Sequence, residues 1–68
     1  MFKRNLFKAK LAEFNMTTEM AARIIGCNVT TLYRKLNGES DFTRNEIQLF
    51  RKKLNLTAQE IESIFFAP

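Results

Sequence analysis

The stretch from Thr17 to Gly38, TTEMAARIIGCNVTTLYRKLNG, constrains the fold most strongly, because its pattern predicts two short helices separated by a tight turn. Thr17 suits the N-cap of a helix over 18–25, since its hydroxyl can accept a hydrogen bond from a free amide of the first turn. Gly26 can adopt the positive φ that a sharp turn requires. A second helix is then expected over 29–37, and Gly38 suits the left-handed position that ends it.

The apolar positions of these two helices predict their buried faces. Ala22 is small enough to let a second helix cross closely, and Leu32 and Leu36 are spaced i and i+4, on one helix face. Asn28 suits the N-cap of the second helix, and Cys27 before it is expected to be a small buried hydrophobic residue. The other positions expected to be buried are Met20, Ala21 and Ile24 or Ile25.

The segment 2–14 is predicted to form a helix with one apolar and one basic face. Its apolar stripe has helical spacing and consists of Phe7, Leu11 and Phe14, flanked by Phe2 and Leu6. The cations outside this stripe are Lys3, Arg4, Lys8 and Lys10. We interpret these cations as a solvated face, in preference to phosphate contacts or a membrane-binding surface.

Two capping boxes, at 43–46 and 57–60, mark the starts of two further helices. In each box a threonine is followed three residues later by a glutamate, so that each side chain can satisfy the backbone amide of the other. These helices are expected over 44–54 and 58–66, with the inward residues Ile47, Phe50, Leu54, Ile61, Ile64 and Phe65. Strand patterns are missing. We therefore predict one all-α domain over 1–68, a compact bundle of five short helices.

Charge and composition limit the functions open to this chain of 68 residues and net charge +4. Residues 1–38 carry seven basic and two acidic residues, whereas residues 39–68 carry four basic and five acidic ones. A basic half that contains the helix pair favours a polyanionic partner. With one cysteine and no histidine, we expect no disulfide, metal or cofactor. An enzyme is rejected, because no nucleophile is paired with a base and no glycine loop suits phosphate.

The outward face of the helix 29–37 carries residues suited to reading DNA in the major groove. Arg34 can donate two hydrogen bonds to O6 and N7 of guanine, and Thr30 can bond a base or a phosphate. Val29 can meet a thymine methyl, and Tyr33 can present its hydroxyl and ring to the sugar-phosphate edge. The alternative is an ordinary solvated helix face. The order of helix, glycine turn, helix with outward Arg and Tyr, and basic flank favours DNA.

On these residues the chain resembles the lambda-repressor-like, Cro/repressor-type helix-turn-helix domains of small temperate-phage regulators from Gram-positive hosts. The matching parts are the stretch 17–38 and the following FTRNEIQLFRKKLNLTAQEIESIFF. The resemblance implies a sequence-specific transcriptional regulator that binds a double-stranded DNA operator as a dimer in the bacterial cytoplasm. It also implies a phosphate contact by Thr18 and base or backbone contacts by Asn28, Val29, Thr30, Arg34 and Asn37.

Three departures from that family stand out. Lys35 occupies a position that is often apolar, so Leu36 is expected to take over its packing role. The turn after Gly38 is often basic in the family, but here it contains the acidic residues Glu39 and Asp41. Arg44 is expected either to pair with them or to contact the DNA backbone. Met20 stands where the family has a capping glutamate, so the helix 18–25 lacks a full capping box.

The acidic turn keeps a second hypothesis open, in which the chain is an anti-repressor that binds a partner phage repressor and alters its DNA binding. Phe65 and Phe66 are expected to offer an apolar patch for such a partner or for a homodimer, unless they complete the core. No run of apolar residues approaches the roughly 18 of a membrane span, so we expect no membrane partner.

Overall fold

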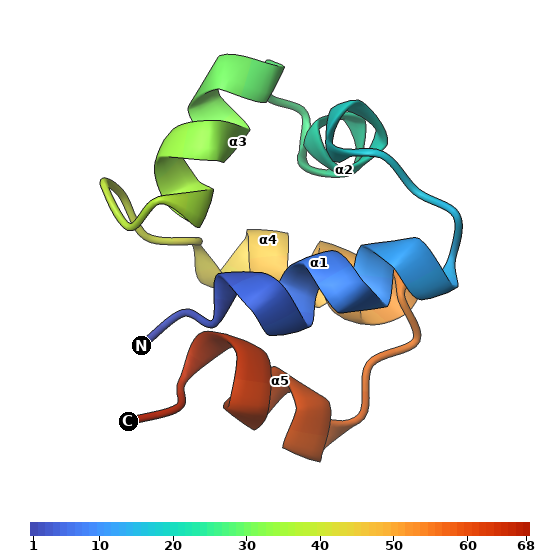
Figure 1. The fold of residues 1–68 in the computed structure, drawn as a ribbon, viewed down its shortest axis with the longest axis vertical. Helices are drawn as coiled ribbons and strands as arrows, with labels where there is room; N and C mark the ends of the chain where they lie inside the picture. The colour runs from blue at the N-terminus through green and yellow to red at the C-terminus, as the bar shows by residue number, and fades with distance from the viewer.

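The computed structural model describes all residues 1–68 and contains five α-helices and no strand (Figure 1). In chain order they are α1 Arg4–Glu13, α2 Thr18–Ile25, α3 Val29–Leu36, α4 Arg44–Lys53 and α5 Ala58–Phe65. The all-α prediction is confirmed, and each helix ends within two residues of its predicted limit. The principal-axis extents of 28 × 25 × 21 Å describe a rounded bundle.

Local side-chain caps explain why four of the helices begin where they do. In each case a side-chain oxygen accepts a hydrogen bond from the amide three residues later, and the capping residues are Thr17, Asn28, Thr43 and Thr57. The reciprocal bonds from the amides of Thr43 and Thr57 to Glu46 and Glu60 are both 2.9 Å long. The two predicted capping boxes are therefore confirmed.

Four helices also end at a residue with positive φ. Gly26 (φ 75°) and Gly38 (φ 81°) take the left-handed conformation expected of them, after α2 and α3. Asn15 (φ 54°) and Asn55 (φ 50°) do the same after α1 and α4. A Cβ built on either glycine would meet nothing within 4 Å, so the backbone angle, and not lack of space, favours glycine there.

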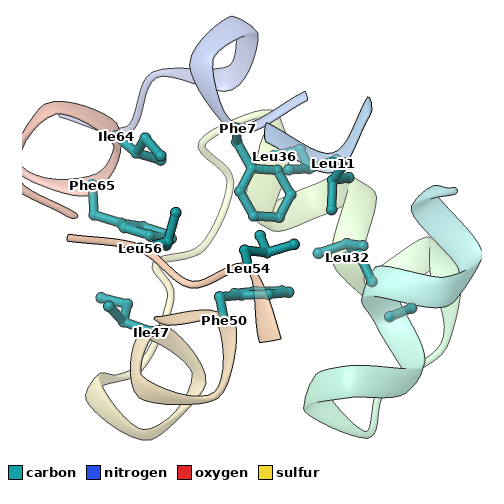
Figure 2. Packing of buried hydrophobic residues seen from close by; sticks show 12 residues of the cluster. Phe7, Leu11, Leu32, Leu36, Ile47, Phe50, Leu54, Leu56, Ile64 and Phe65 are labelled. Carbon is teal, nitrogen blue, oxygen red and sulfur yellow. The ribbon is translucent and has the colours of Figure 1, made fainter. Parts of the chain in front are cut away.

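The core receives residues from all five helices, and Phe7 sits in its middle (Figure 2). Phe7, Leu32, Phe50 and Leu54 are completely buried. Five phenylalanines pack in one cluster with ring-centroid distances between 4.9 and 6.3 Å, and they are Phe2, Phe7, Phe42, Phe50 and Phe65. The predicted inward residues Leu11 and Leu36 are also buried.

Two expectations about burial are wrong. Phe14 is 39% exposed, because it follows the last turn of α1 and leaves the apolar stripe. Met20 is 41% exposed, because α2 packs on α3 and α4 through its small residues Ala21 and Ala22. The remaining apolar residues that the sequence placed inward pack against the core but are only partly buried, namely Ile24, Ile25, Cys27 and Ile61.

The C-terminal phenylalanine pair is divided between core and surface. Phe65 is only 7% exposed and belongs to the core, whereas Phe66 is 55% exposed. Of the two alternatives for this pair, Phe65 completes the core, as its inward position predicted, and packs against the rings of Phe2 and Phe42, so that only Phe66 is left on the surface.

The helices are arranged so that α2 and α3 lie on one side of α1 and α5 lies on the other (Figure 1). Helix α2 packs against α3 and α4, and α1 packs against α5. The chain ends lie together, since the Lys3 amide donates to the Ile64 carbonyl at 2.6 Å and the Met1 amino group donates to the Ala67 carbonyl. None of the five helices combines the length and apolar character needed to cross a membrane.

Candidate nucleic-acid interface

Helix α3 presents one polar stripe to solvent. Leu32 and Leu36 bury the other side of the helix in the core. The exposed residues are spaced i, i+3, i+4 and i+7, which places them on one helix face, and they are Thr30, Tyr33, Arg34 and Asn37. The structure therefore brings together four of the residues that the sequence proposed for DNA contact.

The side chain of Arg34 has no partner within the chain, because it takes part in no ion pair or side-chain hydrogen bond. Its guanidinium donors are free for a ligand. At the start of the helix, Oδ1 of Asn28 accepts from the Thr31 amide at 2.8 Å, which leaves the NH₂ group and the second lone pair of Oδ1 for further contacts. Val29 beside it is half-buried.

Helix α1 contributes two cations to this region that the sequence reasoning treated as solvated. The Arg4 guanidinium donates to the side-chain oxygen of Asn37, at the C-terminal end of α3. The Lys8 ammonium lies 3.3 Å from the Thr18 hydroxyl, at the start of α2. Arg4 and Lys8 are spaced i and i+4, so one face of α1 reaches both helices. That spacing was visible in the sequence, but the partners were not.

Thr18 is less exposed to solvent than expected for a residue that contacts phosphate. Its side chain is buried, with the residue only 8% exposed, and its hydroxyl accepts from Lys8. Lys8 places a positive charge beside Thr18. A phosphate near the start of α2 would therefore meet the Lys8 ammonium.

Lys35, and not Arg44, contacts the acidic turn after α3. The Lys35 ammonium donates to the Asp41 carbonyl at 3.0 Å, lies 3.1 Å from Oε1 of Glu46 and sits 5.8 Å from the Phe42 ring centre. Arg44 is exposed and forms no ion pair, so the expected pairing of Arg44 with the turn is wrong. Leu36 is buried, which confirms that it supplies the packing that Lys35 does not.

The turn between α2 and α3 holds the free thiol of Cys27, which is half-buried. Burial raises the pKa of this thiol, and the Glu46 carboxylate acts in the same direction, so the thiol stays protonated at neutral pH. No cluster of three or more His, Cys, Asp or Glu side chains is arranged to hold a metal ion.

Comparison with protein-family models, with curated proteins and with solved structures gives no match to this chain.

Proposed function

We propose that this chain is a sequence-specific DNA-binding regulator of transcription that places α3 in the major groove. In this proposal α2, the turn 26–28 and α3 act as a helix-turn-helix of the lambda-repressor-like, Cro/repressor type. A turn of three to four residues that contains glycine is typical of that motif. The α3 helix would read bases, and the neighbouring helices would contact phosphates.

The observation that carries the proposal is the free guanidinium of Arg34 within the exposed stripe of α3. Arg34 forms no ion pair and no side-chain hydrogen bond within the chain, and it is the arginine that lies in this stripe of α3. A free guanidinium can donate two bonds to O6 and N7 of guanine. Thr30 lies one turn earlier, on the N-terminal half of the helix from which such readers reach the bases.

Cations around the stripe support the same function. Arg4 and Lys8 lie beside the two ends of the helix pair, and Arg44 is exposed and unpaired at the start of α4. Such charges contact phosphates without reading sequence. No cofactor or reacting group enters this mechanism.

Selection from a random-sequence duplex library at low salt tests the proposal. The purified chain is expected to enrich a defined sequence containing at least one guanine, and the enriched duplex is expected to bind more tightly than a shuffled duplex of the same composition. Affinity for both duplexes should fall steeply as salt rises, because phosphate contacts release counterions. Enrichment of no sequence, or equal affinity for selected and shuffled duplexes, would overturn the proposal.

A further inference from the structure

A groove of about 800 Å³ opens on the side of the molecule where the two chain ends meet the turn after α3. Its volume falls within the range of ligand-binding clefts, roughly 300–1,000 Å³. Its apolar lining includes Phe2, Leu36, Phe42, Ile47, Phe65 and Phe66. Phe66 is the most exposed of the seven phenylalanines. Its exposure leaves an apolar surface here without a partner.

The turn after α3 carries unpaired negative charges on one side of this groove, in a chain whose net charge is positive. Asp41 lines the groove and Glu39 lies in the same turn; both are exposed, and neither forms an ion pair. Two cations belong to the lining residues, the Lys35 ammonium and the Met1 amino group. Lys35 is matched by Glu46 at 3.1 Å, and the Met1 amino group donates to the Ala67 carbonyl at the other chain end. The side of the groove formed by the turn after α3 is therefore complementary to an apolar group that carries a positive charge beside it.

The backbone along the rim also has free hydrogen-bonding groups. The amides of Ser40, Asp41 and Phe42 donate no hydrogen bond to any atom of the chain. The segment 40–42 belongs to no helix. An extended peptide can accept backbone hydrogen bonds here, from these free amides in particular, while its side chains enter neighbouring pockets.

We propose that this groove binds an extended segment of another protein, with apolar side chains on the phenylalanine-lined floor and a lysine or arginine beside Asp41 and Glu39. A second copy of this chain is disfavoured, because a twofold axis through the groove would bring two acidic turns together. Double-stranded DNA is disfavoured for the same electrostatic reason. This binding does not require DNA, and it adds a protein partner to the function proposed above.

Two blocked synthetic peptides, KKFSFKK and EEFSFEE, test the proposal in titrations of the isotope-labelled chain followed by NMR at low salt. Their phenylalanines are two residues apart, so both point to one face of an extended peptide. The basic peptide is expected to shift the amide signals of Leu36, Phe42, Ile47 and Phe66. It is expected to bind at least about tenfold more tightly than the acidic peptide, because Asp41 and Glu39 carry unpaired negative charges beside the groove.

Matched variants locate the binding. Asp41→Lys should reduce the preference for the basic peptide, whereas Glu19→Lys, which reverses an exposed charge on α2, should leave it unchanged. Phe66→Ser should weaken binding of the basic peptide, whereas Phe14→Ser, at an exposed phenylalanine elsewhere, should not. All four positions are exposed, so the folded state should persist in each variant.

Three outcomes would overturn the proposal. The first is the absence of shifts at the groove with the basic peptide. The second is equal affinity for the two peptides. The third is sedimentation of the chain as a dimer that Phe66→Ser dissociates, which would assign the groove to a second copy.

Discussion

The Lys35 ammonium of α3 lies 3.1 Å from Oε1 of Glu46 in α4, and the two side chains are only 11% and 16% exposed. The same carboxylate oxygen accepts from the Thr43 amide at 2.9 Å. The capping box of α4 thus also positions α3, the helix that we propose to read DNA. Glu60 of α5 does the equivalent for α1, since its Oε1 accepts from Thr57 and its Oε2 accepts from Lys10.

Lys35→Met should destabilise the chain, because it removes the charge that Glu46 and the Asp41 carbonyl contact while keeping an apolar chain against Phe42. We expect a loss of about 2 kcal/mol in the free energy of unfolding, the usual scale for a hydrogen bond to a charged group in a mostly buried site. Urea unfolding followed by circular dichroism measures it. Lys53→Met, at an exposed lysine without an ion pair, is the control, and equal losses in the two variants would contradict the expectation.

Arg34→Ala should reduce sequence preference without reducing stability, because the Arg34 side chain is exposed and has no partner in the chain. Binding to the selected duplex should weaken by about 1–3 kcal/mol, while binding to the shuffled duplex changes much less. Fluorescence anisotropy with both duplexes measures the difference. Arg51→Ala, on the exposed side of α4, is the matched control; an equal loss on both duplexes would mean that Arg34 contacts only phosphate.

Lys8→Gln should weaken DNA binding uniformly, because Lys8 lies beside the start of α2 and carries charge without base-reading geometry. The slope of log affinity against log salt should become shallower by about one unit, as expected for the loss of one phosphate contact. Binding titrations at several salt concentrations measure the slope. An unchanged slope would place Lys8 away from the DNA backbone.

Glu60→Gln should make stability less dependent on pH. The hydrogen bond from Lys10 lowers the pKa of Glu60, and the hydrogen bond to Glu60 raises the pKa of Lys10. A carboxylate with a lowered pKa stabilises the folded state above its unfolded pKa of about 4.3, and this contribution is lost as pH falls through the folded value. The lysine contribution is present below its unfolded pKa of about 10.4 and is lost as pH rises through the folded value.

Glutamine can still accept from the Thr57 amide, so Glu60→Gln isolates the charged contact from the capping box. The variant should be less stable than the original chain near pH 7, and the two should converge in acid. Thermal unfolding across pH 3–8 measures this. A difference that persists unchanged at the lowest pH would mean that the cap, and not the charge, is responsible.

Gly26→Ala should cost about 1 kcal/mol, the scale of the strain that an L-residue experiences in the left-handed region. Nothing lies within 4 Å of a Cβ there, so the cost comes from φ and not from a clash. Gly26→Asn should cost less, since Asn15 and Asn55 already adopt positive φ in this chain. Unfolding midpoints compare the variants, and equal stability of Gly26→Ala and the original chain would contradict the strain.

The sequence predicted the helix starts well, because capping involves residues no more than three positions apart. Thr43 with Glu46, and Thr57 with Glu60, form the expected bonds whatever packs around them. Much of the candidate site could be predicted in the same way. Once Leu32 and Leu36 are buried, the helical repeat places Thr30, Tyr33, Arg34 and Asn37 on the exposed side of α3.

The tertiary structure alone decided the contacts between residues far apart in the chain. Arg4 with Asn37, and Lys10 with Glu60, become neighbours only because of how α1 packs against the other helices. Helical spacing placed Phe65 inward, but it could not show that the exposed Phe66 beside it lies next to the turn after α3 and lines the same groove. Local hydrogen bonds set where a helix begins, but the angle at which helices pack determines which apolar and charged side chains meet.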